Sequence, residues 1–178
     1  MAIARGGHMN MDTQSCFALQ PLDTVIVGGT NLGDEFLAIL TESNAPCHLR
    51  LASAFITDSI VSKFSYMNHR TTTIDIVTRP GASFSSAEKI ASSYPWKSAQ
   101  VRFSAKLHAK LFILVRDDMS GAFMVGSHNL TRRGTSSNHE VGVLFRTQKP
   151  RGMMNPLFTA LDQFQQIWSQ SHFPLTVI

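Results

Sequence analysis

Hydrophobic residues recur along the chain in two alternating patterns. Short apolar or β-rich runs separated by turn residues are typical of strands, and in the first half they fall at residues 23–27, 47–55, 72–77 and 100–103. Between them, apolar residues at helical spacing predict helices over residues 34–42 and 58–68, and a further helix is expected over residues 83–93. Strands that alternate with helices predict a βα sheet with parallel pairs.

The second strand and the helix after it carry two specific expectations. Side chains of a strand alternate between its faces, so one side of residues 47–55 should carry Leu49, Leu51, Ser53 and Phe55. Thr57 or Asp58 is suited to cap the following helix, because a side-chain oxygen there can accept a hydrogen bond from the first turn.

The second half of the chain predicts a hairpin, another strand and a long helix. The run from Leu107 to Val115 is expected to form a strand, Arg116 to Gly121 the turn, and Ala122 to Val125 the return strand. A further strand is expected over residues 141–145. Residues 153–170 should form a helix whose apolar face carries Leu157, Leu161, Phe164 and Trp168. The predicted fold is α/β, a mixed and partly parallel β-sheet with helices on both faces.

The composition is that of one globular domain. The chain has 178 residues, of which 43% are hydrophobic and 16% are charged, which suits a sizeable core. The formal net charge of +4 fits a nucleic acid or another polyanion as partner, although a solvated surface gives the same value. No apolar run reaches the ~20 residues of a membrane span. The two cysteines form no spacing motif, so we expect reduced thiols and a cytoplasmic protein.

The first residues are set apart from the predicted domain. Met1 to Met9 resemble a cloning remnant and are left out of the fold prediction. Residues 10–178 are expected to form a single domain, and the sequence leaves open whether they are a fragment of a longer chain.

Polar side chains gather at the ends of the hairpin and of the last strand. His108 and Lys110 alternate with apolar residues, so we expect both at the mouth of a cleft where the core ends. A lysine in that position needs an anionic partner. Ser127 and Asn129, again two positions apart, add a hydroxyl and a carboxamide, and such a donor-rich pocket suits a phosphate. Glu140 is the single nearby carboxylate and can fix the tautomer of an imidazole.

The order of these residues carries a family resemblance. His108-x-Lys110, then Gly126-Ser127-x-Asn129, then Glu140 resembles the phospholipase D superfamily, most closely its small single-motif nucleases and the nuclease domains of some restriction enzymes. The resemblance implies a phospholipase D-like fold for residues 10–178. Family members often carry Asp five residues after the Lys, where this chain has Val115. That Asp is mostly structural in the family, so the departure bears little on the chemistry.

The resemblance also implies a reaction. His108 would attack phosphorus and form a phosphohistidine, Lys110, Ser127 and Asn129 would hold the non-bridging oxygens, and Glu140 would orient His108. A second imidazole must act as general acid, and no other His-x-Lys occurs in the chain. In single-motif members two subunits share one site, which implies a C2 homodimer with both His108 side chains at one phosphate. No metal and no cofactor is expected.

Four basic residues are further candidates for contacting substrate. Arg79 follows a strand end and could line the cleft. Lys106, Arg132 and Arg133 flank the motif and could meet a nucleic-acid backbone. For each of the four, an ordinary surface charge is the alternative interpretation.

These observations lead to one functional hypothesis and three rivals. We expect a metal-independent DNA endonuclease, such as the cleavage domain of a restriction or defence enzyme, and an additional DNA-binding domain or partner subunit is compatible with it. An RNase is a variant of the same hypothesis. A phospholipid phosphodiesterase or transferase is the second alternative, although the sequence shows neither an amphipathic membrane-binding helix nor a duplicated motif. A non-catalytic nucleic-acid-binding dimer module is the third.

Overall fold

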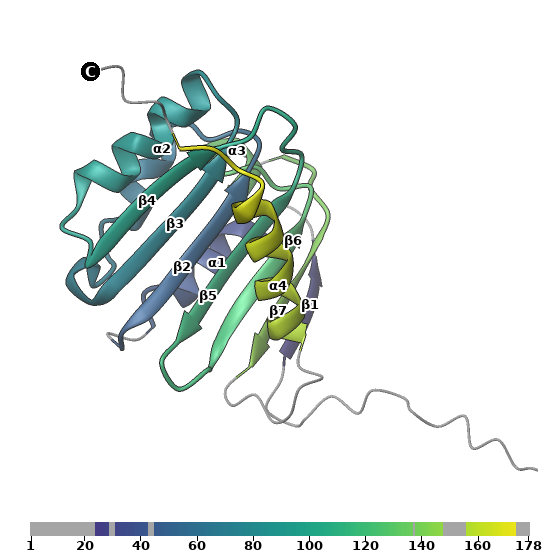
Figure 1. Ribbon diagram of the computed structural model, residues 1–178. Coiled ribbons are helices and arrows are strands. Elements are labelled where there is room, and N and C mark those ends of the chain that lie inside the picture. Colours follow the sequence, from purple (N-terminus) through teal and green to yellow (C-terminus); the bar gives the residue numbers. More distant parts are fainter. Residues whose placement is uncertain (1–23, 29–30, 43–44, 137, 148–155, 174–178) are drawn as a thin grey trace, which may run out of the picture.

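One seven-stranded sheet organises the residues that the structure describes. The computed structural model describes residues 24–28, 31–42, 45–136, 138–147 and 156–173 (Figure 1). The strands are β1 (Thr24–Gly28), β2 (Cys47–Ser53), β3 (Thr72–Thr78), β4 (Ser98–Phe103), β5 (Lys110–Arg116), β6 (Gly121–Gly126) and β7 (Gly142–Thr147). The helices are α1 (Leu32–Ile39), α2 (Ala82–Ser93), α3 (Arg132–Ser136) and α4 (Pro156–Ser169), with two 3-10 segments, η1 (Asp58–Phe64) and η2 (His69–Thr71).

The strand order combines parallel and antiparallel pairing. The order across the sheet is β1-β7-β6-β5-β2-β3-β4. β2, β3 and β4 run parallel, because η1 and α2 return the chain to the same edge after β2 and β3. The strands from β2 through β5, β6 and β7 to β1 pair antiparallel, and β5 and β6 form the expected hairpin. The predicted mixed, partly parallel sheet is confirmed.

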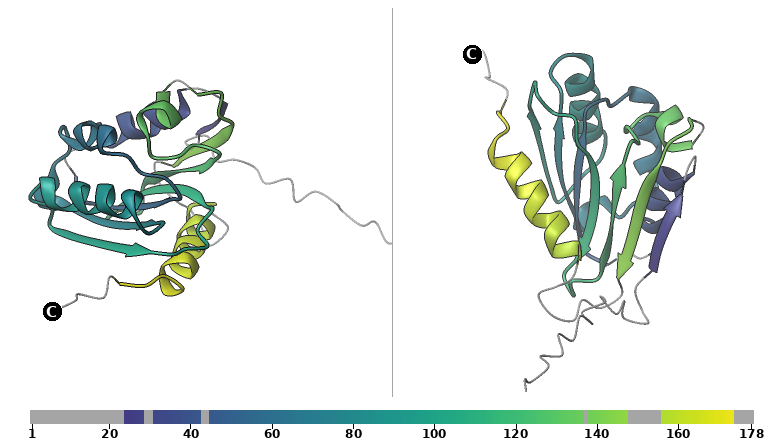
Figure 2. Two further views of the ribbon diagram at one scale, coloured as in Figure 1. Left: turned by 90° about the horizontal axis from the view of Figure 1, so that it is seen from above. Right: turned by 90° about the vertical axis from the view of Figure 1, so that its right-hand side faces the viewer.

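Helices cover both faces of the sheet, as the sequence predicts. Figure 2 shows α1, α2 and α3 on one face and α4 on the other. The first face buries alternate residues of the central strands, such as Leu49, Ile74 and Phe112, against Phe36 of α1 and Phe64 of η1. Each large apolar side chain buried in this way contributes roughly 1.5–3 kcal/mol.

The second core lies under α4. Its strand residues alternate with the strand residues of the first core, and the remaining members come from α4 and from the loop before β5. The members are Ala52, Val77, Leu107, Leu111, Ile113, Leu157, Ala160 and Phe164. The predicted helix of residues 153–170 is therefore present from Pro156 to Ser169 with its expected apolar face, while residues 153–155 lie outside the described residues. Among the described helices, none combines the length and the apolar character that a membrane span requires.

The start of β5 differs from the sequence prediction. The strand begins at Lys110 and not at Leu107, so His108 lies in the loop that precedes it. The Leu107 amide donates to Ser104 O at 3.1 Å, and the Leu107 carbonyl accepts a hydrogen bond from Arg79 Nε at 2.9 Å. Because these contacts occupy the backbone of Leu107, the sheet ladder starts only at Lys110, which pairs with Ser53.

Two other predictions near η1 are wrong in detail. Of the helix expected over residues 58–68, only residues 58–64 are helical, as the 3-10 segment η1, and neither Thr57 nor Asp58 caps it with its side chain. Asp58 instead accepts hydrogen bonds from Lys89 and Ser86 of α2, and these bonds lower the pKa of its carboxyl group. The five residues of α3 were not expected, because their polar sequence has no apolar period.

Candidate active site

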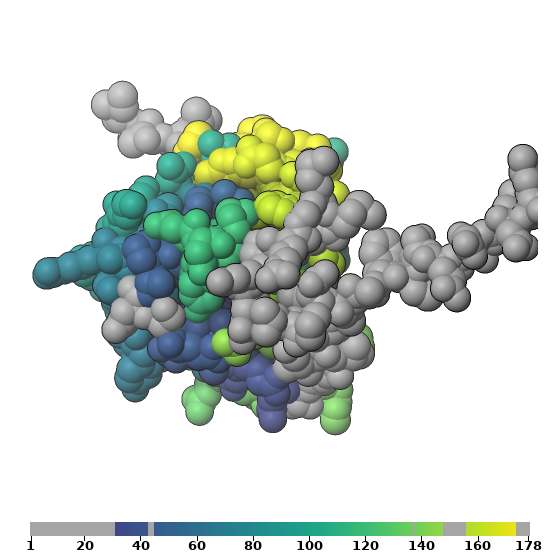
Figure 3. All heavy atoms as spheres, turned by 90° about the horizontal axis from the view of Figure 1, so that it is seen from below, coloured from purple at the N-terminus to yellow at the C-terminus, as the bar shows by residue number. Residues whose placement is uncertain are grey.

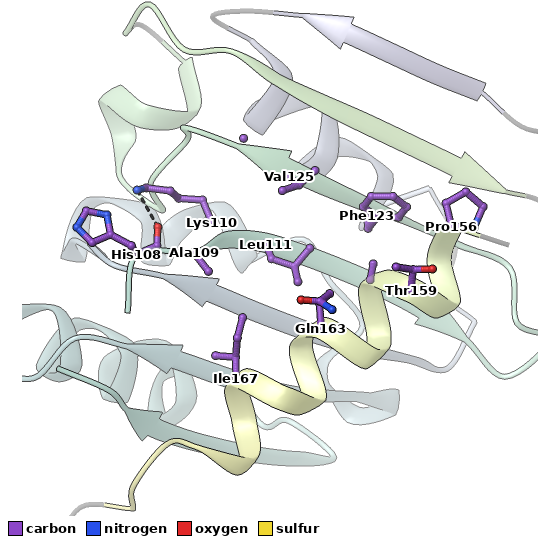
Figure 4. A pocket seen from close by; sticks show the side chains of 12 residues that line it. His108, Ala109, Lys110, Leu111, Phe123, Val125, Pro156, Thr159, Gln163 and Ile167 are labelled. Carbon is purple, nitrogen blue, oxygen red and sulfur yellow. Dashed lines mark hydrogen bonds between the residues drawn. The ribbon is translucent and has the colours of Figure 1, made fainter. Parts of the chain in front are cut away.

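The His-x-Lys segment lies at the edge of the sheet where β2 and β3 end and β5 begins. Lys110 is the first residue of β5 and pairs with Ser53, the last residue of β2. The His108 side chain is exposed two residues earlier. Lys110 Nζ donates to the His108 carbonyl oxygen at 2.9 Å, and both side chains lie at one end of the same cavity (Figure 4). Both residues therefore line one cavity, although His108 lies in the loop before β5 and not on the strand.

The Gly-Ser-x-Asn segment is brought to this edge by the pairing of β6 with β5 and β7. Leu111 pairs with Val125, and Gly126 pairs with Gly142, so the end of β6 lies beside the start of β5. A Cβ atom on Gly126 would lie 2.4 Å from the Val141 carbonyl oxygen. Only glycine therefore allows β6 and β7 to approach this closely just before the motif serine.

Ser127 and Glu140 contact each other directly. The Ser127 amide donates to Val141 O at 2.9 Å, and its hydroxyl oxygen accepts from the Val141 amide at 3.0 Å. The same hydroxyl donates to Glu140 Oε2, and Asn138 Nδ2 donates to Glu140 Oε1 at 3.3 Å. Among the described residues, the hydrogen bonds of Glu140 go to Ser127 and Asn138 and not to His108. The orienting role expected for Glu140 therefore stays a prediction.

Asn129 is held in place by the two residues that follow it. The Leu130 amide donates to Ser53 Oγ at 2.9 Å, and Leu130 forms a parallel bridge with Ile56, so this loop is fixed to the end of β2. The Asn129 carbonyl accepts from the Thr131 amide at 2.8 Å. Its carboxamide oxygen is buried without a hydrogen-bond partner in the described part of the chain.

The cavity beside His108 and Lys110 is lined mainly by apolar side chains. It has a volume of about 730 Å³ and lies between α4 and the face of β5 and β6 that α4 covers. Leu111, Phe123 and Val125 come from the sheet, and Gln163 and Ile167 come from α4 (Figure 4). A cationic, donor-rich edge next to an apolar hollow can accommodate an organic phosphodiester, whose phosphate and organic parts differ in polarity.

The four basic candidates lie at different depths around this edge. Arg79 is half-buried and donates to the Leu107 carbonyl, directly before His108. Lys106 is exposed in the turn before that point. Arg132 and Arg133 are exposed at the start of α3, which follows the Asn129 loop. The structure therefore brings Arg79 to the His-x-Lys segment and leaves the other three on the surrounding surface.

Of the remaining described histidines, two lie at the opposite end of the sheet and two lie next to motif residues. His48 lies at the start of β2, where its Nε2 is 2.7 Å from Asp75 Oδ2, and His69 stacks on Tyr94 before β3. Both are at the end of the sheet that carries the β5–β6 turn, which Figure 3 shows in green at the centre. His139 is exposed next to Glu140, and His128 is buried. The described residues contain no cluster of three or more His, Cys, Asp or Glu side chains suited to hold a metal ion.

Phe55 is exposed next to the candidate site, in contrast to the sequence prediction. It is expected on one side of the strand with Leu49, Leu51 and Ser53, which are buried, yet its side chain is 49% exposed. β2 ends at Ser53, and the strand alternation ends with it. The signal in the sequence is an aromatic residue between two small or apolar residues at a strand end, which alone does not distinguish a core position from a surface one.

Comparison with known proteins agrees with this architecture. The family model described as "Cardiolipin synthase, PLD-like domain" matches residues 36–168, while no curated protein matches. Nuc from Salmonella typhimurium, a phospholipase D family member, is similar in structure with a TM-score of 0.61 and 21% identity, covering 85% of this chain and 97% of its own.

Two further solved structures share the fold. NucT from Helicobacter pylori has a TM-score of 0.57 and 13% identity, covering 85% of this chain and 99% of its own. Yeast tyrosyl-DNA phosphodiesterase has a TM-score of 0.50 and 16% identity, covering 83% of this chain and 37% of its own. At the level of the family these matches support a phosphodiesterase. Because the family model spans most of the sequence, the chain belongs to the phospholipase D-like domain family.

Proposed function

We propose that this protein is a metal-independent endonuclease that cleaves DNA through a phosphohistidine at His108. One observation carries the proposal. The fold brings His108 and Lys110 to the same sheet edge as Ser127, Asn129 and Glu140, in a chain that belongs to a phosphodiesterase family. The order of these residues resembles the motif of the single-motif nucleases.

The chemistry divides among these side chains. The exposed imidazole of His108 is accessible for attack on phosphorus. Lys110 and the Asn129 carboxamide are suited to stabilise charge on the non-bridging oxygens. The Ser127 hydroxyl, which donates to Glu140 in this structure, would contact the phosphate only after rotating its hydrogen away from that carboxylate.

We further propose that two copies share one site, because protonation of the leaving oxygen needs a second imidazole. Among the described histidines, only His139 is both exposed and beside the motif residues. The second His108 of a C2 dimer and His139 of the same chain are therefore the two candidates for the general acid. The resemblance favours the former.

DNA is the substrate class that the surroundings of the site favour. The chain has a formal net charge of +4, and Arg79, Lys106, Arg132 and Arg133 surround the motif segments. A structurally similar protein is named for a DNA phosphodiester linkage, yeast tyrosyl-DNA phosphodiesterase. A role in restriction or defence rests on the sequence resemblance alone.

A phospholipid phosphodiesterase is the second candidate function. The description of the matching family model names cardiolipin synthase, and the apolar cavity beside His108 could hold an acyl chain. A lipid enzyme would cleave phospholipid vesicles and leave plasmid DNA intact.

Plasmid cleavage in excess EDTA tests the proposal. We expect wild-type protein to nick supercoiled DNA and the His108→Ala variant to be inactive. His48→Ala is the matched control, because it removes an imidazole at the opposite end of β2. Cleavage that survives in His108→Ala would show that His108 is not the nucleophile, and activity on phospholipid vesicles alone would favour the second candidate.

Subunit mixing tests the shared site. Excess His108→Ala protein, equilibrated with wild type, should lower the activity of the wild type by forming mixed dimers. If mixing has no effect while His139→Ala abolishes cleavage, the general acid belongs to the same chain and the dimer proposal is wrong.

A further inference from the structure

Phe55 presents an aromatic ring to solvent from a rigid support. The ring is 49% exposed, whereas the neighbouring Ala54 and Ile56 are 0% and 2% exposed. The Phe55 carbonyl accepts from Ser53 Oγ at 2.8 Å, and Ile56 forms a bridge with Leu130. Because both neighbours are buried and Ile56 is bridged to Leu130, the ring cannot withdraw into the core without displacing them.

Arg79 lies between this ring and the His-x-Lys segment. Its Nε donates to the Leu107 carbonyl at 2.9 Å, and its Cζ atom is 5.7 Å from the centre of the Phe55 ring. A guanidinium group has five N–H donors, and this contact uses one of them. The group is therefore oriented by the residue before His108, and its terminal nitrogens, which have no hydrogen bond to the described residues, can bind an anion.

The sheet places this pair at the same edge as the motif residues. Ser53, two residues before Phe55, pairs with Lys110, and its carbonyl accepts a hydrogen bond from Thr78 Oγ1 at 2.8 Å. Arg79 directly follows Thr78. Phe55 and Arg79 thus flank the start of β5 on the side of β2 and β3, whereas the Ser127 and Asn129 segment flanks it on the side of β6.

An exposed ring beside an oriented guanidinium group fits one kind of ligand. The flat face of an aromatic ring stacks on a nucleobase, and every base has such a face. In a duplex the neighbouring base pairs cover both faces, so stacking on protein needs an unpaired or flipped base. The guanidinium group matches the phosphate that accompanies that base.

We propose that Phe55 and Arg79 form a subsite for a single-stranded or locally unpaired nucleotide next to the scissile phosphate. The base stacks on Phe55, and Arg79 holds the neighbouring phosphate. This inference rests on the proposed nuclease function and specifies the form of its substrate. It makes Phe55 a binding residue and leaves the reacting groups at His108 and its neighbours unchanged.

Binding of two oligonucleotides separates stacking from other roles of Phe55. Oligothymidylate and an all-abasic oligonucleotide of the same length have the same phosphates but differ in their bases. Dissociation constants are measured by fluorescence anisotropy in EDTA, with His108→Ala in every protein to prevent cleavage. Phe55→Leu keeps an apolar side chain without an aromatic face, and Phe55→Trp restores the face. Tyr66→Leu is the control, because Tyr66 is 82% exposed on the loop after η1.

We expect the Phe55 substitution to weaken binding of the probe that has bases and not of the abasic probe. Phe55→Leu should weaken oligothymidylate binding roughly 5- to 150-fold, the range of one base–aromatic stack, and change abasic binding less than about twofold. Phe55→Trp and Tyr66→Leu should bind both probes like the parent. Arg79→Gln should weaken both probes and lower the salt slope by about 1, whereas Arg70→Gln, an exposed arginine of η2, should not.

Three results would overturn the subsite. Equal losses for both probes in Phe55→Leu would show that the ring acts through the fold or through contact with a second copy, and sedimentation of the variant would distinguish these roles. Unchanged binding of both probes would show that Phe55 does not touch nucleic acid. Absence of single-strand binding in every protein would also refute the subsite, while the plasmid assay decides the nuclease function independently.

Discussion

Ser53 connects the end of β2 to both sides of the candidate site, so its removal should affect stability and activity together. Its side chain is fully buried, donates to Phe55 O at 2.8 Å and accepts from the Leu130 amide at 2.9 Å. Ser53→Ala removes both bonds without adding volume. The Leu130 amide is then left buried without a partner, whereas the Phe55 carbonyl, on an exposed residue, can turn to water.

The size of the effect follows from these two groups. A buried, unsatisfied backbone donor costs about 1–3 kcal/mol, and the loss of a hydrogen bond that water can replace costs about 0.5–1 kcal/mol. The free energy of unfolding should therefore fall by about 1.5–4 kcal/mol. For a domain of this size that corresponds to a fall in Tm of roughly 3–16 °C.

Urea denaturation and thermal melting measure this loss, with Ser65→Ala as the matched control. The exposed Ser65 hydroxyl donates to Ser62 O at 2.7 Å, so its removal should cost less than about 0.5 kcal/mol. At a temperature where both variants are folded, Ser53→Ala should also cleave DNA more slowly, because Asn129 loses its anchor. If the two serine variants unfold at the same urea concentration, Ser53 does not hold the site together.

Two further predictions concern Gly134 and Cys47. Gly134→Ala should lower the free energy of unfolding, measured in urea, by roughly 1–3 kcal/mol and slow cleavage, because the added Cβ would lie 2.5 Å from the Asn129 carbonyl oxygen. The same change usually stabilises a helix, so a more stable variant would contradict this prediction. Burial raises the pKa of the Cys47 thiol, so at a given pH less thiolate is present than in the unfolded chain. In a Cys16→Ser background, alkylation by iodoacetamide followed by mass spectrometry should give a pH profile displaced upward from that of the urea-unfolded protein, and a downward displacement would refute the assignment.

The sequence predicts the elements whose patterns are local. The apolar alternation within β2, β3 and β5 is confirmed, although β2 ends at Ser53 and β5 begins at Lys110, and the β5–β6 turn falls within the expected Arg116 to Gly121. Each of these patterns depends on neighbouring residues. The predicted hairpin accounts for the pairing of β5 with β6, which brings the Ser127 segment beside the start of β5. The sequence does not predict the antiparallel pairing of β5 with β2. The helical spacing of α4 is also confirmed.

Contacts between distant residues account for most of the differences. Arg79, 28 positions before Leu107, donates a hydrogen bond to the Leu107 carbonyl, so β5 begins only after that residue. No local sequence pattern contains that information. The exposure of Phe55 depends on Ser53 bonding to Leu130, 77 positions away. The short helix α3 has a local signal of its own in Thr131, whose Oγ1 accepts a hydrogen bond from the Gly134 amide as an N-cap residue does.

The covalent intermediate is the most direct test of the central claim that His108 is the nucleophile. Wild-type protein mixed with a short DNA substrate in EDTA is quenched in alkali, which preserves a phosphorus–nitrogen bond, and is then analysed by intact-mass and peptide mass spectrometry. We predict a nucleotide adduct on the peptide that contains His108, and no adduct in the His108→Ala variant. Rapid cleavage without an adduct at any time point, or an adduct on another residue, would contradict the account.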